Sequence, residues 1–173
     1  MKALASVAMA GVCVAAAAQN VTERAHAETS FDLRVKAPYA ETAKLFGPEG
    51  ERAWAGKHWD PQFVYPAEPR DEQGAVFTIQ HGPLTAVWVI AQHDVEARHF
   101  QYVYILGDLM VCTIDVRFAE AGANATTVHV TYARTAVRAE GDAHVATMAE
   151  GDRRAGAEWQ AAIDSHLSDH KNR

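Results

Sequence analysis

The chain has 173 residues, of which 49% are hydrophobic and 22% are charged, and its formal net charge is −6. This length suits one domain with a sizeable core. Lys and Arg form no cluster, so the composition argues against nucleic acid and anionic membrane surfaces as partners, and the mild acidity says little about a substrate.

The first 27 residues are typical of a secretory signal peptide. Lys2 supplies a positive start, an uncharged Ala/Val-rich stretch follows from Ala3 to Ala18, and Ala25-His26-Ala27 offers a cleavage pattern. The stretch is too short for a stable membrane span, which needs roughly 20 apolar residues. We therefore expect an exported protein, periplasmic or secreted, with a single mature domain over residues 28–173. Ala16-Ala17-Ala18 is a rival cleavage site, and a cytoplasmic location is the alternative if the segment is not a signal peptide.

The first part of the domain is expected to form one strand and two short helices. Alternating apolar residues predict a half-buried strand over Ser30–Lys36. A short helix is expected over Tyr39–Phe46 and a second one from Pro48 to Gly56, because Pro suits a first helical position and Gly closes a helix. Trp54 then falls near the end of the second helix, and Trp59 falls in the loop that follows.

From Gly74 onward the apolar residues recur with a period of two, which predicts five further strands. The connections between them are short and favour an antiparallel meander. The expected strands are Ala75–His81, Ala86–His93, His99–Leu106, Leu109–Ala119 and Thr126–Arg138.

One face of these strands is apolar and is expected to point inward. The other face, with Gln101, Thr113, Asp115, Arg117, His129 and Thr131, is expected to be solvated. The inner face carries Phe77, Ile79, His81, Trp88, Ile90, Phe100, Tyr102, Tyr104, Met110, Cys112, Ile114, Val116, Val128, Val130 and Tyr132.

The last segment, Gly141 to His170, has the period of an amphipathic helix. Gly151 and Gly156 each weaken such a helix by about 1 kcal/mol relative to Ala, unless they allow a close approach to the sheet. The apolar stripe of this helix holds Val145, Met148, Asp152, Ala155, Trp159, Ile163 and then His166 or Leu167.

This order of elements predicts an α+β fold of the helix-grip type, in which a curved antiparallel sheet of about six strands wraps around a long C-terminal helix. Two short helices follow the first strand. Both apolar surfaces are buried if the helix lies across the concave side of the sheet. A strongly curved sheet leaves space beneath the helix, so a cavity is expected between them.

Several motifs fit this arrangement, above all Glu51-Arg52-x-Trp54 and the run from Trp59 to Pro66, Trp-Asp-Pro-x-Phe-x-Tyr-Pro. Together with Gly74-x-Val76-Phe77 and the late Trp159, they resemble the START/Bet v 1-like superfamily, whose bacterial members are called SRPBCC or polyketide cyclase/dehydrase-like proteins. The resemblance covers about residues 30–168. It implies a cavity that binds lipids, polyketides or other apolar molecules, and it carries over no catalytic residue.

The segment from Gly50 to Pro66 is an aromatic run that contains Trp54, Trp59, Phe63 and Tyr65. This run is either a cavity mouth or a hydrophobic plug. We expect Trp54 to be structural, whereas Trp59 and Tyr65 are expected to contact a ligand. Glu51, Arg52 and Asp60 are expected to form a surface ion-pair network worth about 0–1 kcal/mol. The polar groups of the inner face are either ligand contacts or satisfied core groups. The candidate ligand-binding residues are Trp59, Tyr65, Phe77, His81, Trp88, Tyr102, Tyr104, Met110, Cys112, Tyr132, Met148 and Asp152.

The sequence contains no H-E-x-x-H, C-x-x-C, phosphate-loop or dinucleotide motif, so no metal and no cofactor is expected. Cys112 is expected to be a small buried hydrophobe. The leading hypothesis is the binding of a small hydrophobic or amphipathic molecule in the cavity. One alternative is a cyclase, dehydratase or hydrolase in which Tyr102 and His81 act on such a ligand. Another is a protein-interaction module of the chaperone-activator type, which export would disfavour.

Overall fold

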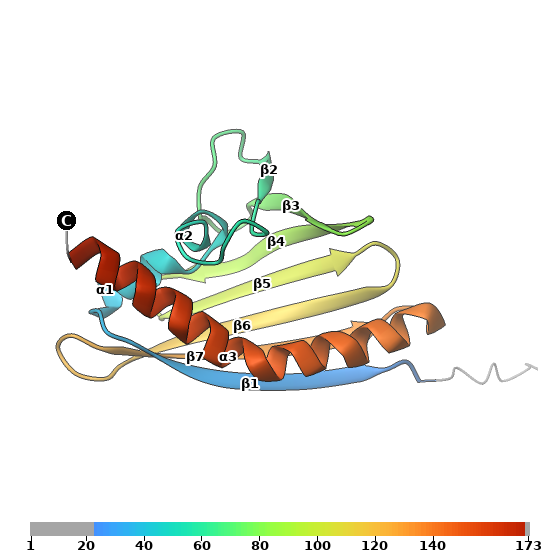
Figure 1. Ribbon diagram of the computed structural model, residues 1–173. Coiled ribbons are helices and arrows are strands. Elements are labelled where there is room, and N and C mark those ends of the chain that lie inside the picture. The colour runs from blue at the N-terminus through green and yellow to red at the C-terminus, as the bar shows by residue number, and fades with distance from the viewer. Residues whose placement is uncertain (1–22, 172–173) are drawn as a thin grey trace, which may run out of the picture.

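The computed structural model describes residues 23–171, which form a seven-stranded antiparallel sheet with a long helix lying across one face (Figure 1). The spatial order of the strands is β1-β7-β6-β5-β4-β3-β2. In chain order the elements are β1 (His26–Val35), α1 (Tyr39–Thr42), the 3-10 turn η1 (Ala43–Leu45), α2 (Pro48–Glu51), β2 (Gln62–Tyr65), β3 (Val76–His81), β4 (Leu84–Asp94), β5 (His99–Leu106), β6 (Met110–Glu120), β7 (Thr126–Ala136), the 3-10 turn η2 (Ala139–Gly141) and α3 (Asp142–Lys171).

The helix-grip architecture expected from the sequence is confirmed. Strands β3 to β7 form the meander, and β1 pairs with β7 at one edge of the sheet. The chain then passes through α1 and α2 and returns to the opposite edge at β2. This path brings α2 over the end of the sheet where α3 also passes, so three layers meet there (Figure 1).

The strand bounds otherwise agree with the expectation to within two residues, but three elements differ more. The second short helix ends at Glu51 rather than Gly56, so Trp54 lies in the turn after it. β1 begins at His26, four residues before the expected start, and its first residues pair with Thr135 and Arg134 of β7. β2 was not expected at all, because a four-residue edge strand with one half-buried side chain leaves no visible alternation. Residues 1–22 of the expected signal peptide lie outside the described residues.

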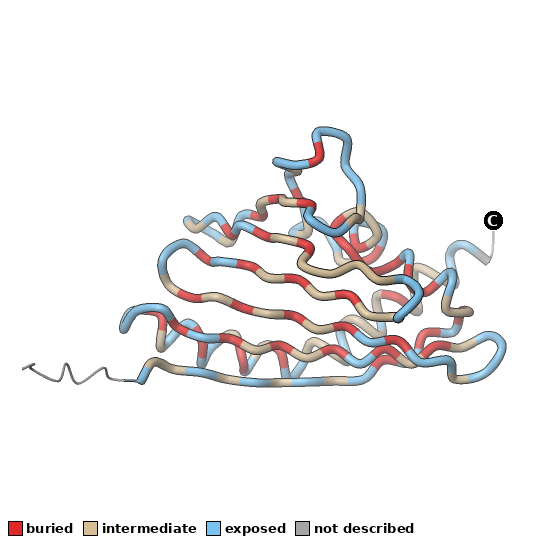
Figure 2. Tube along the Cα trace, turned by 180° about the vertical axis from the view of Figure 1, so that it is seen from behind, coloured by how far each residue is buried: buried red, intermediate tan, exposed pale blue. Residues whose placement is uncertain are grey.

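The expected inner face is confirmed strand by strand. Each of its members is buried except His81, which is half-buried. The alternation of buried and partly exposed positions is visible along β4 to β7 (Figure 2). Since a slip of one residue would reverse every side chain, this outcome fixes the side chains that can face a cavity.

The expected stripe of α3 is buried at Val145, Asp152 and Ile163 and half-buried at its other positions. Its two glycines have different roles. A Cβ atom at Gly156 would lie 2.9 Å from the Cβ of Phe31 in β1, so only glycine permits this approach of helix and strand. Gly151 has no neighbouring atom within 4 Å of such a Cβ, so it weakens the helix without a packing reason.

Candidate ligand cavity

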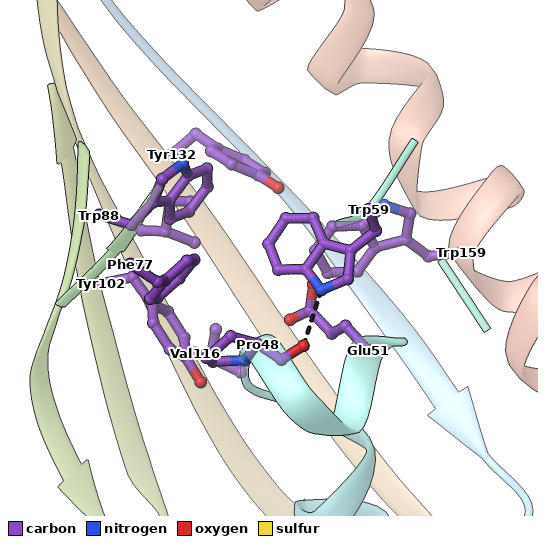
Figure 3. A pocket seen from close by; sticks show the side chains of 10 residues that line it. Pro48, Glu51, Trp59, Phe77, Trp88, Tyr102, Val116, Tyr132 and Trp159 are labelled. Atoms are coloured by element: carbon purple, nitrogen blue, oxygen red, sulfur yellow. Dashed lines mark hydrogen bonds between the residues drawn. The ribbon is translucent and has the colours of Figure 1, made fainter. Parts of the chain in front are cut away.

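A cavity lies between the concave side of the sheet, α2 and α3. It consists of a small inner chamber of about 40 Å³ and an outer chamber of about 360 Å³. Glu51, Trp59, Trp88, Tyr132 and Trp159 line both chambers, which are therefore parts of one space. Figure 3 shows the inner chamber, with Trp88, Phe77 and Tyr102 on the sheet side and Trp59 and Trp159 on the side of α3.

Flat rings form the walls of this cavity. The ring of Trp88 stacks on Phe77 at 5.7 Å and on Tyr104 at 4.3 Å, because the register places these residues opposite one another on β3, β4 and β5. Trp59 meets Trp88 edge-on at 5.6 Å, and its indole N–H donates to the Pro48 carbonyl at 2.9 Å. Trp59 therefore closes over the sheet and is held by α2.

Three buried polar atoms have no hydrogen-bond partner among the described residues: Nε2 of His81, Nε1 of Trp88 and the hydroxyl of Tyr102. The side chains of Trp88 and Tyr102 are only 7% and 5% exposed, and all three residues line the cavity. Buried polar groups nearly always have a partner, so these atoms mark the places where a partner from outside the chain would bind.

Glu51 is the unexpected member of the site. It is the last residue of α2 and only 8% exposed, and its Oε1 accepts a hydrogen bond from the Gly47 N–H at 3.3 Å. Burial raises the pKa of Glu51 to about 8, and the charge of Asp71 adds to this effect. The expected pairing of Glu51 with Arg52 is wrong, since Arg52 bonds to Glu49 at 2.8 Å and to Asp60 at 3.1 Å.

Asp71, which lies 20 residues after the end of α2 in the sequence, holds this helix in position. The carboxylate of Asp71 accepts hydrogen bonds from the N–H groups of Glu49 at 2.9 Å and Gly50 at 3.0 Å. Both amides belong to the first turn of α2, where backbone N–H groups have no partner within the helix itself. Trp54 adds a second anchor, because its indole N–H donates to the Leu45 carbonyl at 2.7 Å. The helical turn that carries Glu51 is therefore held in place by the hydrogen bonds of Asp71 and Trp54.

A buried ion pair borders the outer chamber. Arg134 of β7 makes two hydrogen bonds of 2.6 Å to the two carboxylate oxygens of Asp152 in α3. Arg134 also donates to the Tyr104 hydroxyl, and Thr29 donates to Asp152 at 3.2 Å. Burial alone would lower the pKa of Arg134, but the paired carboxylate raises it above its ordinary value. This pair links sheet and helix at the cavity wall.

The candidate residues divide into four groups. Trp59, Phe77, His81, Trp88, Tyr102, Tyr104, Tyr132 and Met148 line the cavity. Asp152 acts through Arg134, while Met110 and Cys112 are enclosed beside the cavity and line neither chamber. Burial raises the pKa of the Cys112 thiol to about 12, which disfavours the thiolate. Tyr65 lies on β2 with 60% of its surface exposed and borders neither chamber. Trp54, expected to be structural, also borders the outer chamber.

Sequence reasoning missed Glu51 and Arg134. The period-two pattern Val128, Val130, Tyr132 continues to Arg134, so the signal for an inward arginine was present in β7. For Glu51 no comparable signal exists, because a single turn of helix shows no period.

A second hollow of about 470 Å³ lies outside this cavity, between the α1–η1 segment and the ends of β4 and β5. His93 lines it, and its ring lies 4.1 Å from that of Phe100. None of the three unpartnered polar atoms faces this hollow, so it lacks the feature that distinguishes the main cavity.

Residues 23–171 contain no group of three or more His, Cys, Asp or Glu side chains arranged to hold a metal ion. No helix in the same range is long and apolar enough to cross a membrane.

Several solved structures have a fold similar to that of this chain. No family model and no curated protein sequence matches the chain. Among solved structures, norcoclaurine synthase from Thalictrum flavum, in complex with dopamine and hydroxybenzaldehyde, aligns with a TM-score of 0.64 and 12% identity, over 94% of this chain and 98% of that one. An uncharacterised Rhizobium leguminosarum protein aligns with a TM-score of 0.53 and 15% identity, over 83% of this chain and 99% of that one.

The di-domain aromatase/cyclase BexL, from the BE-7585A biosynthetic pathway, aligns with a TM-score of 0.60 and 15% identity. The match covers 80% of this chain and 46% of BexL, so the chain corresponds to less than half of that protein. At these identities the similarity shows the fold alone. The helix-grip fold that the resemblance to the START/Bet v 1-like superfamily implied is confirmed, and solved structures with this fold include a synthase and an aromatase/cyclase.

Proposed function

We propose that the protein binds a small, flat, ring-containing molecule that carries a hydrogen-bond acceptor, in the cavity between α2, the sheet and α3. The observation that carries this proposal is the pair of unpartnered, buried donors, the Trp88 indole N–H and the Tyr102 hydroxyl, in a chamber lined mostly by aromatic and aliphatic side chains. A ligand oxygen placed at either donor satisfies that donor, and the aromatic walls suit a ring-containing body.

The shape of the site favours rings over extended acyl chains. Phe77, Trp88 and Tyr104 stack on one another, with interplanar angles of 18° and 22°, and so form a rigid aromatic wall. A rigid ring compound loses less conformational freedom than a flexible acyl chain when it packs against such a wall. The norcoclaurine synthase structure, which has the same fold, contains two ring compounds.

Calorimetric titration with 2-naphthol, naphthalene and palmitate tests the proposal. 2-Naphthol is expected to bind roughly fivefold to tenfold more tightly than naphthalene, because one added hydrogen bond is worth about 1–1.4 kcal/mol. Tyr102→Phe is expected to reduce this difference and to leave naphthalene binding unchanged. Equal affinities for the two ring compounds, or tighter binding of palmitate, would contradict the proposal. Quenching of tryptophan fluorescence provides a second readout, because all four Trp residues border the cavity.

An enzyme that acts on such a ligand is the second candidate, and Glu51 is the observation that favours it. A carboxyl group with its pKa raised to about 8 can give and take protons near neutral pH, unlike an exposed carboxylate. Of the two groups expected to act as acid or base, burial lowers the pKa of His81 and raises that of Tyr102, so both are neutral near pH 7.

Export remains part of the proposal, with cleavage before residue 23. The Ala25 N–H donates to Asp142 at 2.9 Å, and Arg24 pairs with the same carboxylate at 3.3 Å. Cleavage after Ala27 would remove these contacts together with two residues of β1, so the rival site at Ala16-Ala17-Ala18 is the better choice. The intact mass of the protein recovered from the periplasm or medium tests this, and a mature chain starting at Glu28 would refute it.

A further inference from the structure

We propose that Glu51 is a catalytic base that removes a proton from the carbon next to the carbonyl group of a bound ring ketone. This inference rests on the ligand binding proposed above and extends it to a reaction.

The first support is the position of the carboxyl group. Glu51 lines both chambers, and Figure 3 shows its oxygens directed into the space between α2 and the rings of Trp59 and Trp159. One oxygen, Oε1, accepts from the Gly47 N–H at 3.3 Å. The second oxygen receives no hydrogen bond from the described residues, which leaves it available for a proton from a ligand.

The second support is the pair of donors in the same chamber. The indole N–H of Trp88 and the hydroxyl of Tyr102 line the inner chamber with Glu51 and have no protein partner. A carbonyl oxygen placed at either donor is stabilised as negative charge develops on it, because the donor is fixed before the reaction and lies in an apolar surrounding. A base and an oxyanion donor therefore flank one small space.

The groups around Glu51 determine when it is ionised. Asp71, from the segment before β3, is the acidic neighbour, and Tyr102 of β5 and Tyr132 of β7 are neutral near pH 7. α3 contributes the uncharged Trp159 to both chambers and Glu158 to the outer one. With its pKa raised to about 8 by burial, Glu51 is partly ionised at neutral pH and is a stronger base than an exposed carboxylate.

The reaction is balanced without a cofactor or a second reactant. The C–H bond breaks and its proton forms a bond to the Glu51 carboxylate. The C–H electron pair becomes the carbon–carbon double bond of an enolate, and the carbonyl electrons move to oxygen, which accepts a hydrogen bond from Tyr102 or Trp88. The proton on the Glu51 carboxyl group then exchanges with D₂O, and transfer of a deuteron from Glu51 back to carbon restores the ketone with deuterium in place of hydrogen.

The test uses 2-tetralone in D₂O, with loss of the signal of the protons next to its carbonyl followed by proton NMR. Wild-type protein is expected to accelerate the exchange over buffer, and Glu51→Gln is expected to lower the enzymatic rate by at least 100-fold. The control is Glu49→Gln, which changes a carboxyl group of the same helix that bonds to Arg52 outside the cavity. This variant is expected to retain the wild-type rate. The wild-type rate is expected to rise with pH and to level off above about pH 8.

Calorimetric binding of 2-tetralone separates the two proposals. If the ketone binds wild-type and Glu51→Gln protein within about threefold but exchange is no faster than in buffer, the catalytic inference is overturned and ligand binding stands. Exchange that survives in Glu51→Gln, or that rises with hydroxide without levelling off, overturns it equally. If 2-tetralone and 2-naphthol both fail to bind, the proposed function fails first.

Discussion

Replacing Asp152 with Asn is expected to lower the free energy of unfolding by about 3–5 kcal/mol, because it leaves the buried charge of Arg134 uncompensated. Arg134 is 4% exposed and Asp152 is 7% exposed, so water replaces little of the lost interaction. Both hydrogen bonds of the pair measure 2.6 Å, and the other partners of Arg134 are the Tyr104 hydroxyl and the Met148 sulfur, neither of which carries a negative charge. In a domain of ordinary stability, about 5–15 kcal/mol, the loss is a large fraction of the total.

Urea unfolding followed by circular dichroism measures the change. The matched control is Asp164→Asn on the same helix, whose partner Lys36 lies 3.3 Å away and is exposed, so that change is expected to cost less than about 1 kcal/mol. The double replacement Arg134→Met with Asp152→Leu removes both charges and is expected to cost far less than Asp152→Asn alone. A loss below about 1 kcal/mol for Asp152→Asn, or a double variant as unstable as the single one, would refute this reasoning.

Three further predictions concern stability. The pKa of Glu51 is about 8 in the folded chain, above its ordinary value of 4.5, so wild-type stability falls as pH rises through this window. The free energy of unfolding of Glu51→Gln, relative to that of wild type, is therefore expected to rise by up to about 4 kcal/mol between pH 4.5 and pH 8. A difference in urea midpoint between the two proteins that is the same at both pH values would contradict this. Gly151→Ala is expected to raise the free energy of unfolding by about 0.5–1 kcal/mol, whereas Gly156→Ala is expected to lower it by about 1–3 kcal/mol, because its Cβ would meet Phe31 at 2.9 Å. Thermal unfolding of the two variants checks this contrast, and equal shifts would count against the close approach of α3 and β1. Trp54→Phe keeps most of the ring packing but loses the bond to Leu45, so a loss of about 1–2 kcal/mol is expected in urea, and an unchanged midpoint would show that the bond contributes nothing.

The strands of the meander could be predicted from sequence because each buries one face and exposes the other. Trp88, Tyr104 and Cys112 lie on adjacent strands as aligned inward residues, and their positions follow from the period of two alone. The long helix was equally accessible, since its apolar stripe recurs over many turns. β2 and the exact extent of β1 were not, because pairing with a neighbouring strand, rather than any local pattern, defines them.

The candidate site was predicted only where its residues belong to regular strands. Tyr102 and Tyr132 lie in the cavity wall as expected, but Tyr65 follows a bulge between Phe63 and Tyr65 and stays on the surface. Glu51 could not be identified, because its burial depends on Asp71, which caps α2 from 20 residues further along the chain. Charged residues that fold into a core through such remote contacts carry no local signature.

The shortness of β2 has a consequence for how this protein behaves in concentrated solution. An unpaired strand at the rim of a sheet can recruit a strand from another molecule, and Val64 and Tyr65 are 66% and 60% exposed there. β2 has only four residues, its pairing with β3 is interrupted by a bulge, and Pro61 and Pro66 flank it without backbone N–H groups to donate. The aromatic run thus ends the sheet in a form that resists edge-to-edge self-association.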